Sequence, residues 1–470
     1  MTSTPASPDL ISRLAQVVGA AQVLTEAADL APYLTDWRGR YRGQAQCVVR
    51  PGNTEEVAAV VRACAEADAV IVPQGGNTSL CGAATPDDSG CAVIVSLSRM
   101  NRILAVDADN STISVEAGCT LAAVQAAAQA VNRLFPLALA SEGSCQIGGN
   151  LSTNAGGVQV LRYGNTRELT LGLEVVLPDG QVWQGLRGLR KDNTGYDLKQ
   201  LFIGAEGTLG IITAAVLKLF PLPEPQTTCW LNVASPAAAV DVLNAAKSRF
   251  DAQLTAFELV SEVALGLVLQ HIPGARRPGT TSPWYVLAEF SGAGPAEVEV
   301  WLGEQLASDA VLGGTLAASA TQAASLWALR ESISEAQKIE GLSIKHDIAV
   351  PVSQVPTFLS RVDAQLSAAF PGIRVVAFGH LGDGNLHYNL SRPLAGDNAD
   401  FMACQGDVNR IVHDAVHALN GTISAEHGLG QLKRDEILRY KSGVEMDLMR
   451  RIKLAIDPQG RMNPGKLLTG

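Results

Sequence analysis

The stretch from Ser144 to Gly157 reads SCQIGGNLSTNAGG, and small or polar residues fill almost all of it. A segment with so few bulky apolar side chains cannot build a core. It can instead lie flat along a planar ring and a pyrophosphate, because glycine lets the backbone approach a ligand closely. The stretch therefore indicates either a cofactor site or a set of tight turns between strands.

A second glycine-rich loop, Pro73-Gln74-Gly75-Gly76-Asn77-Thr78-Ser79, follows an apolar strand expected at 69–72. Backbone N–H groups at such a loop can surround a phosphate. Two loops of this kind in one region indicate a large anionic cofactor. Neither loop is a GxGxxG at a strand–helix junction, so a Rossmann domain is not indicated.

The pattern around these loops alternates between strand and helix. Asn53 and Glu56 have the spacing of an N-cap residue and its N3 partner, which predicts a helix ending near Glu66. Further strands are expected at 92–96, 112–117, 169–177 and 209–219, with a helix at 120–132. The proline-rich segment 221–225 predicts a domain boundary.

Residues 226–375 form a different block. Alanine-rich helices are expected at 236–247, 294–307 and 315–340, with strands at 253–258, 284–290 and 343–349. No parallel-sheet rhythm joins them, which favours an α+β cap domain. Helices at 355–369 and 400–419 follow. We expect a helical lead-in over 1–42, and then domains over 43–222, 223–425 and 426–470.

Composition limits the classes of partner. The chain has 470 residues, 36 basic and 46 acidic side chains and a net charge of -10, which argues against nucleic acid and anionic membranes. The eight cysteines form no CxxC pair, as is typical of a reduced compartment. No run of 18 apolar residues occurs, and no signal peptide is evident. The expectation is a cytoplasmic protein without a transmembrane segment.

Two histidines flank a Gly-Asp-Gly turn between Phe378 and Asn389. Asp-Gly between apolar runs predicts a hairpin. With the turn at Asp383-Gly384, His380 would face His387, and opposed Cβ atoms lie about 4.5–5.5 Å apart. That spacing suits a two-histidine metal clamp, and Glu426 adds a carboxylate. Asp383 itself is explained by the turn.

Two other readings of the histidines remain open. The pair could be ordinary packed side chains, or it could activate water in a metal-dependent hydrolase, which would leave the glycine-rich half unexplained. His413 and His417 are i and i+4 on an expected helix, a spacing that can bind metal. We interpret them as surface or interface residues, because no third ligand is near in sequence.

Several motifs in one order resemble a known superfamily. They are the loop at 73–77, the stretch 147–164, the segment Gly204-Ala205-Glu206-Gly207-Thr208-Leu209-Gly210, and the later segments at 379–387, 426–427 and 463–466. Together they resemble the vanillyl-alcohol oxidase superfamily, with its PCMH-type FAD domain, and within it the D-2-hydroxyacid dehydrogenase branch. The resemblance covers roughly residues 45–470. It implies an α+β fold, with an FAD domain of two α/β subdomains, a cap domain, and a C-terminal segment that returns to the FAD domain.

The resemblance also implies which residues bind non-covalent FAD. A histidyl link from the FAD domain is excluded, since no histidine precedes His271, and Cys145 is better explained by packing. The implied cofactor-binding residues are Pro73, Gly75, Gly76, Asn77, Thr78, Ser79, Ser141, Gly143, Gly148, Gly149, Asn150, Ser152, Asn154, Gly157, Glu206, Ile212 and Asn463.

The metal ligands implied are His380, His387 and Glu426, for Zn²⁺ or else Mn²⁺ or Fe²⁺. His427 follows a ligand directly and points elsewhere, so it is the candidate general base that removes the hydroxyl proton. The resemblance places the substrate on Arg330 and Lys345. Ser334, i+4 from Arg330, and Asn389, on the face of His387, complete the expected substrate site.

The expected activity is oxidation of a D-2-hydroxy acid to a 2-oxo acid by hydride transfer to FAD. D-2-hydroxyglutarate is favoured, because Arg330, Ser334 and Lys345 could hold a second carboxylate. D-lactate and a glycolate oxidase-like flavin subunit are the alternatives. Electrons would pass to an electron-transfer protein or a quinone, since no nicotinamide fingerprint is present. A homodimer is compatible with the sequence.

Overall fold

The computed structural model describes residues 8–469, so expectations for residues 1–7 and 470 lie outside the described part. The chain divides into two compact units. Unit 1 comprises residues up to Gly156, then Gly164–Leu222 and Glu426 onward. Unit 2 comprises Gly157–Tyr163 and Pro223–Ala425.

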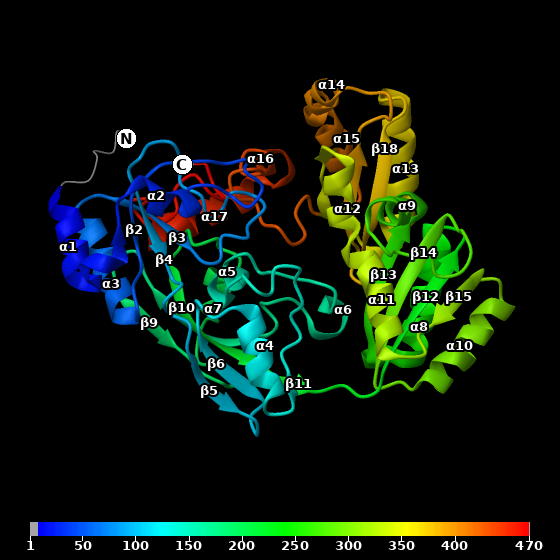
Figure 1. The fold of residues 1–470 in the computed structure, drawn as a ribbon. Coiled ribbons are helices and arrows are strands. Elements are labelled where there is room, and N and C mark those ends of the chain that lie inside the picture. Colours follow the sequence, from blue (N-terminus) through cyan, green and yellow to red (C-terminus); the bar gives the residue numbers. More distant parts are fainter. Residues whose placement is uncertain (1–7, 470) are drawn as a thin grey trace. The chain divides into compact units, whose positions relative to one another are not determined.

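The first sheet of unit 1 has the order β1-β2-β4-β3. Its strands are β1 (Val23–Leu24), β2 (Ala45–Val49), β4 (Ala92–Ser96) and β3 (Val70–Gln74), and β2 and β3 run parallel to β4. The helices α1 (Pro8–Val18) and α3 (Thr54–Glu66) pack beside each other (Figure 1). The predicted cap of α3 is present, since the Asn53 side chain accepts the N–H of Glu56 at 2.8 Å.

The second sheet of unit 1 is antiparallel, in the order β5-β6-β10-β8-β9. Its strands are β5 (Ile103–Asp107), β6 (Thr112–Glu116), β10 (Ile211–Lys218), β8 (Thr170–Val176) and β9 (Val182–Gly185). The helix α4 spans Leu121–Gln129, and the short α7 spans Lys199–Phe202. A two-stranded ribbon joins β7 (Arg133–Leu134) to β11 (Phe220–Pro221).

The glycine-rich stretch contains a short helix, α5 (Ile147–Ser152), that the sequence did not predict. Glycine disfavours helices, so propensity gives no signal here. Hydrogen bonds to another segment stabilise the first turn of the helix: the N–H groups of Ile147 and Gly148 donate to Cys119 O at 2.9 Å and Ala117 O at 2.7 Å. The backbone geometry of the stretch therefore depends on its neighbours.

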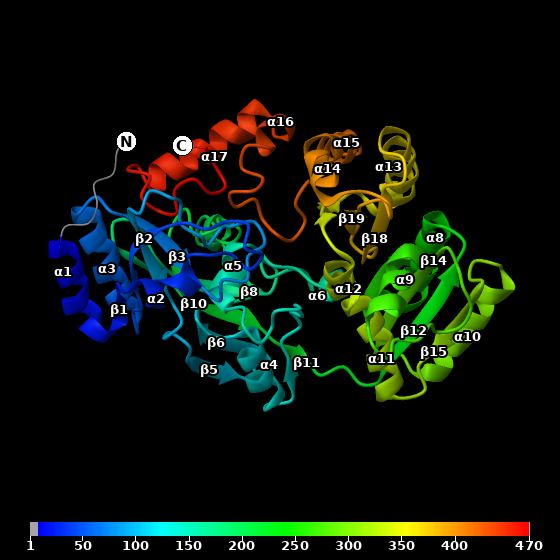
Figure 2. The same ribbon diagram turned by 45° about the horizontal axis from the view of Figure 1, so that its top comes forward.

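The C-terminal segment packs onto the first sheet. Ile71 in β3 donates to Arg461 O and accepts from Asn463 N–H, at 2.9 and 2.8 Å, which adds a parallel bridge at the edge of β3. Before it come α16 (Ile437–Tyr440) and α17 (Gly443–Ile456), drawn in red in Figure 2. A capping box of Ser442 and Glu445 begins α17.

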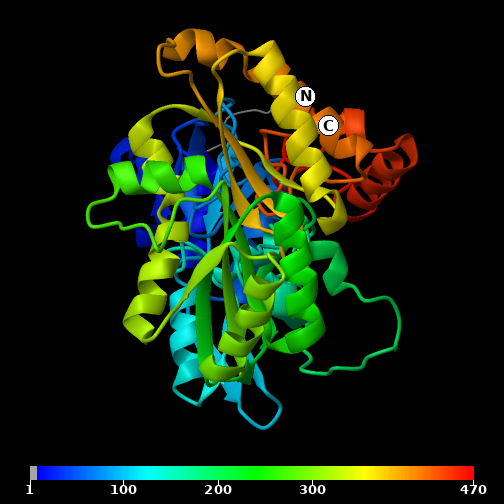
Figure 3. The same cartoon turned by 90° about the vertical axis from the view of Figure 1, so that its right-hand side faces the viewer.

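Unit 2 is built on one eight-stranded sheet with the order β15-β12-β14-β13-β18-β19-β16, in which β17 also pairs with β19. Every pairing is antiparallel. The long strands are β12 (Gln226–Val233), β13 (Leu254–Ser261), β14 (Trp284–Ser291), β18 (Arg374–His380) and β19 (Asn385–Ser391). The short ones are β15 (Gly313–Leu316), β16 (Ser343–Ile344) and β17 (Asp347–Ala349). Figure 3 shows the β18–β19 hairpin continuing the green strands.

Helices cover both faces of this sheet. On one face α9 (Glu262–His271), α11 (Ala320–Glu331) and α12 (Ile333–Glu340) share an apolar core with Trp230, Leu287 and Phe378. Phe290 points to the other face, because successive strand residues alternate. There its ring contacts Phe250 of α8 (Pro236–Phe250) and Trp301 of α10 (Pro295–Ala307). The remaining helices are α6 (Val160–Tyr163), α13 (Val355–Ala369), α14 (Asn398–Ala403) and α15 (Gln405–Ala418).

One expectation about this unit needs correction, and two others concern the whole described chain. The single helix predicted over 315–340 is wrong, because β15, α11 and α12 occupy this range and Ser332 breaks the helix with ψ of -5°. None of the eight cysteines, all of which the structure describes, forms a disulfide bond, and seven are buried. Among the described residues, no helix has the length and apolar character needed to span a membrane.

Candidate metal and flavin sites

The two histidines of the hairpin are diagonal neighbours. The predicted register is wrong: His380 pairs with Asn385, and His387 pairs with Phe378. The loop has four residues, Leu381 to Gly384, because it is held by residues from other parts of unit 2. The N–H of Gly382 donates to Phe257 O at 3.2 Å, and Gly382 O accepts from Lys247 Nζ at 3.1 Å. Asp383 accepts the N–H of Asn385 at 3.0 Å, and Gly384 adopts the positive φ of 84°.

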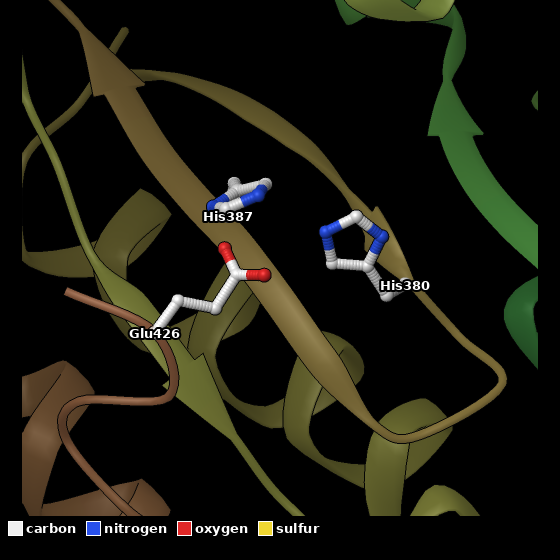
Figure 4. A group of neighbouring side chains, drawn as sticks. All are labelled: His380, His387 and Glu426. Carbon is white, nitrogen blue, oxygen red and sulfur yellow. The ribbon is translucent and has the colours of Figure 1, made fainter. Parts of the chain in front are cut away.

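The diagonal placement still brings both imidazoles to one face of the sheet. Their ring centroids are 5.6 Å apart, with planes at 77°. Thr422 pairs with Ala349 of β17, and Ala425 donates to Asp347 O at 3.3 Å, so the chain reaches Glu426 alongside this strand. One ligand atom from each of His380, His387 and Glu426 lies within 4.8 Å of the others (Figure 4).

This donor set suits a divalent metal. Two imidazole nitrogens and one carboxylate oxygen form one of the ligand sets found in catalytic zinc sites, which keep a fourth position open for substrate or water. Mn²⁺ and Fe²⁺ accept the same donors. A second group of donor atoms, from Asp347, Glu426 and His427, shares the carboxylate of Glu426. The expected base His427 is half-buried.

Glu258, which was not among the predicted site residues, lies opposite His380 in the β13–β18 pairing. Its side chain is fully buried, and Oε1 accepts a hydrogen bond from Nδ1 of His380 at 2.7 Å. Its other oxygen, Oε2, accepts from Nε of Arg330 at 2.8 Å. A sequence signal existed, since Glu258 is the only charged residue in the apolar strand LTAFELVS, and a buried carboxylate is rare unless it is paired.

Two opposing effects act on the Glu258 carboxyl. Burial on its own would raise its pKa, but the neighbouring His380 and Arg330 outweigh burial and hold the pKa at about 2. Glu258 is therefore ionised in the folded protein. The buried guanidinium of Arg330 also lies over the ring of Phe378, with Cζ 4.8 Å from the centroid.

Arg330 retains unused hydrogen-bonding capacity. Its Nη2 is 2.8 Å from Glu258 Oε2, yet this buried nitrogen directs its N–H groups at no acceptor among the described residues. An orphaned, buried guanidinium N–H is costly and suits an anionic ligand. Ser334 does not share the buried face of Arg330 as predicted: the break at Ser332 leaves Arg330 7% exposed and Ser334 on the surface.

The other expected substrate residues lie in the same unit. Lys345 is half-buried between β16 and β17. Asn389 is buried, donates to Gln337 Oε1 at 2.8 Å and accepts the backbone N–H of His346. The surface interpretation of His413 is wrong, because its buried ring lies 5.5 Å from that of His346; only His417 is exposed.

The two glycine-rich loops of unit 1 touch each other. A Cβ placed on Gly76 would lie 2.0 Å from Ser144 O, and one on Gly75 would lie 3.4 Å from Gln146 Oε1. In contrast, a Cβ on Gly149 or Gly143 would meet nothing within 4 Å. The buried Oδ1 of Asn77 and Oε1 of Gln146 lack hydrogen-bond partners within the described chain. Open space at Gly149 and two buried polar atoms without partners, all within the same two loops, fit a bound polar cofactor.

Two of the residues expected to bind FAD, Glu206 and Asn463, form hydrogen bonds within unit 1. Glu206 is buried, and its carboxylate accepts the N–H groups of Leu429 and Gly430 at 2.7 and 2.8 Å. Burial raises its pKa, and these two N–H groups oppose the rise. Asn463 donates to Glu206 O at 2.7 Å and to Ala83 O at 2.9 Å. Both residues join the C-terminal segment to the rest of unit 1.

Of the other expected FAD residues, Asn150, Ser152 and Asn154 belong to the second glycine-rich stretch, whereas Ile212 lies in a strand. Ile212 is buried in β10. Ser152 Oγ donates to Gly148 O at 2.7 Å, and Asn154, at φ of 50°, accepts the N–H of Arg167. Asn150 donates to Cys145 Sγ at 3.6 Å, so Cys145 packs inside unit 1.

Comparison with known proteins gives the family. Residues 45–185 match the family described as FAD binding domain, and residues 222–467 match FAD linked oxidases, C-terminal domain. A D-2-hydroxyglutarate dehydrogenase of Xanthomonas citri pv. viticola is 41% identical over 471 residues, which cover 98% of this chain and 97% of the relative. The chain belongs to the FAD-linked oxidases.

A further relative supports this family, and solved structures show the same fold. The mitochondrial D-2-hydroxyglutarate dehydrogenase of Bos taurus is 38% identical over 98% of this chain and 84% of its own length. The solved structure of p-cresol methylhydroxylase has the same fold, with a TM-score of 0.77 at 18% identity, covering 99% of this chain and 98% of that one. The solved structure of alkyldihydroxyacetonephosphate synthase has a TM-score of 0.73 at 18% identity, and the match covers 98% of this chain and 88% of that one. The resemblance and fold class expected from the motifs are thereby confirmed.

Proposed function

We propose that this chain is an FAD-dependent, metal-assisted dehydrogenase of D-2-hydroxyglutarate. The observation that carries the proposal is the convergence of His380, His387 and Glu426 as a donor set, in a chain that also has the loops of an FAD binding domain. The names of the relatives support the substrate, since the two compared above are called D-2-hydroxyglutarate dehydrogenases.

The residues divide the chemistry between them. Bound FAD supplies a hydride acceptor, and a bound divalent metal supplies a Lewis acid that makes the substrate hydroxyl more acidic. His427 takes the hydroxyl proton, so the substrate loses one proton and one hydride and becomes the 2-oxo acid. Arg330, with its orphaned Nη2, binds a carboxylate, and Lys345 adds a second cation. Asn389 orients the same end of the substrate.

The acceptor of the electrons is proposed to be an electron-transfer protein or a quinone. D-lactate oxidation is the nearest alternative, because Arg330 could bind the single carboxylate of lactate equally well. A metal-dependent hydrolase would use the same ligands without flavin.

A substrate panel with an artificial dye acceptor tests the proposal. The purified protein should be yellow and should turn over D-2-hydroxyglutarate with a higher kcat/KM than D-lactate. Faster turnover of D-lactate would reassign the substrate. A colourless protein that hydrolyses esters or amides would contradict the proposal and favour a hydrolase.

A further inference from the structure

Glu258 occupies an unusual position for a carboxylate. It lies in the middle of β13, between β14 and β18, and every residue of this strand is buried. Its neighbours on the same face of the sheet include Leu287 and Phe378, which belong to the apolar core under α9, α11 and α12. Replacing a buried ion pair with apolar residues is often neutral or stabilising. Packing alone therefore gives no reason for a carboxylate here.

The two oxygens of the Glu258 carboxylate accept hydrogen bonds from two side chains of the proposed site, His380 and Arg330. Oε1 accepts from Nδ1 of His380 at 2.7 Å, so the Nδ1 atom carries the proton and Nε2 keeps its lone pair for a metal. Oε2 accepts from Nε of Arg330 at 2.8 Å and leaves the Nη2 N–H groups available. One side chain thus holds a metal ligand on β18 and a substrate-binding guanidinium on α11.

We propose that Glu258 is a positioning residue that fixes the metal-binding nitrogen of His380 and the plane of Arg330. The inference rests on the proposed function. Partners that hold a ligating histidine raise its basicity, and their loss costs about 10- to 100-fold in metal affinity or activity. Glu258 also partly neutralises Arg330, which sets how strongly that cation attracts an anionic substrate.

The test is the zinc affinity of Glu258→Gln, measured by titrating metal-depleted, FAD-loaded protein with buffered Zn²⁺. The variant is nearly isosteric but uncharged, so zinc should bind about 10- to 100-fold more weakly than to the wild type. The zinc-induced rise in the unfolding midpoint should shrink in parallel. Wild-type zinc affinity in a folded Glu258→Gln protein would overturn the inference.

Glu289→Gln is the matched control. Glu289 is a second buried carboxylate in the same sheet, on β14, but its partner is Nε1 of Trp327 at 3.0 Å. This variant should bind zinc like the wild type. An equal loss of affinity in both variants would mean that any buried carboxylate of this sheet affects the site, and would also overturn the inference.

Two further outcomes separate this inference from the proposed function. If the wild type binds no zinc, manganese or iron, the metal site itself is wrong and the inference falls with it. If Glu258→Gln does not fold, the double variant Glu258→Gln with Arg330→Met removes both charges of the pair. Wild-type zinc affinity in that double variant would contradict a role for Glu258 at His380.

Discussion

His380 and His387 lie diagonally across the hairpin β18–β19, and their ring centroids are 5.6 Å apart. With Glu426 they form the only three-ligand group that takes two imidazoles from one hairpin among the residues described. We therefore expect His387→Ala to lose bound metal and nearly all substrate oxidation while it keeps FAD. Metal content by mass spectrometry and flavin absorbance measure the two separately.

Chelation of the wild type should have the same effect as this substitution. Activity should fall as metal is removed and return when Zn²⁺, Mn²⁺ or Fe²⁺ is added, with the flavin spectrum unchanged throughout. The control for His387→Ala is His271→Ala, because the His271 ring contacts Glu340 and His271 is not one of the three proposed ligands. This variant should keep its metal. Full activity in metal-free protein would show that the donor set has no catalytic role.

Gly149 offers a steric test of the flavin site. A Cβ at this position meets nothing within 4 Å, so Gly149→Leu should leave the apoprotein folded, and loss of a helical glycine should stabilise it by up to about 1 kcal/mol. The new side chain would enter the space expected for FAD and should abolish flavin binding. Flavin retention after purification, together with the unfolding midpoint, measures both effects.

Gly303→Leu is the matched control for Gly149. Gly303 is exposed on α10 in unit 2, and a Cβ there also meets nothing within 4 Å. The Gly303→Leu protein should gain a similar free energy of unfolding and keep its full flavin content. If Gly149→Leu also kept its flavin, the cofactor would lie elsewhere than along α5.

Arg330→Lys tests the carboxylate site. Lysine keeps the charge but lacks the planar fork of N–H groups that binds carboxylates. A charged hydrogen bond contributes about 1.5–3 kcal/mol, so KM for D-2-hydroxyglutarate should rise about 10- to 100-fold. The unfolding free energy should be measured too, because disturbing a buried pair is destabilising.

The control for this substitution is Arg374→Lys. Arg374 is in the same unit and pairs with Glu340 at 2.7 Å, with 23% of its side chain exposed. The KM of the Arg374→Lys protein for D-2-hydroxyglutarate should stay near the wild-type value. A well-folded Arg330→Lys protein with an unchanged KM would place the substrate carboxylate elsewhere.

His427→Ala tests the general base. FAD and metal should remain bound, but the rate of flavin reduction by substrate should fall by about 10²- to 10⁴-fold, the usual contribution of a positioned base. Stopped-flow absorbance follows the reduction directly. Reduction at the wild-type rate would exclude His427 from proton transfer.

Much of the fold was predictable because it depends on local signals. The apolar run at 92–96 predicted β4, and the spacing of Asn53 and Glu56 predicted α3. The convergence of His380, His387 and Glu426 was also predicted from sequence, although the register of the hairpin was wrong. Loop length there is set by contacts of Gly382 with Phe257 and Lys247, which come from distant parts of the chain.

The features that the sequence analysis missed depend on tertiary contacts. The helix α5 forms against glycine's low propensity because Ala117 and Cys119 hold its first turn. The break at Ser332 separates Arg330 from Ser334, which a regular helix would have placed on one face. Glu258 was visible as a lone charge in a buried strand, but its two partners come from residues 72 and 122 positions away.

Anaerobic titration of the purified protein with the two enantiomers of 2-hydroxyglutarate tests the proposed activity most directly. The D enantiomer should bleach the flavin absorbance fully, with one equivalent of 2-oxo acid formed per flavin, and the L enantiomer should leave the flavin oxidised. Flavin that stays oxidised with D-2-hydroxyglutarate and with every other D-2-hydroxy acid would contradict the proposed activity.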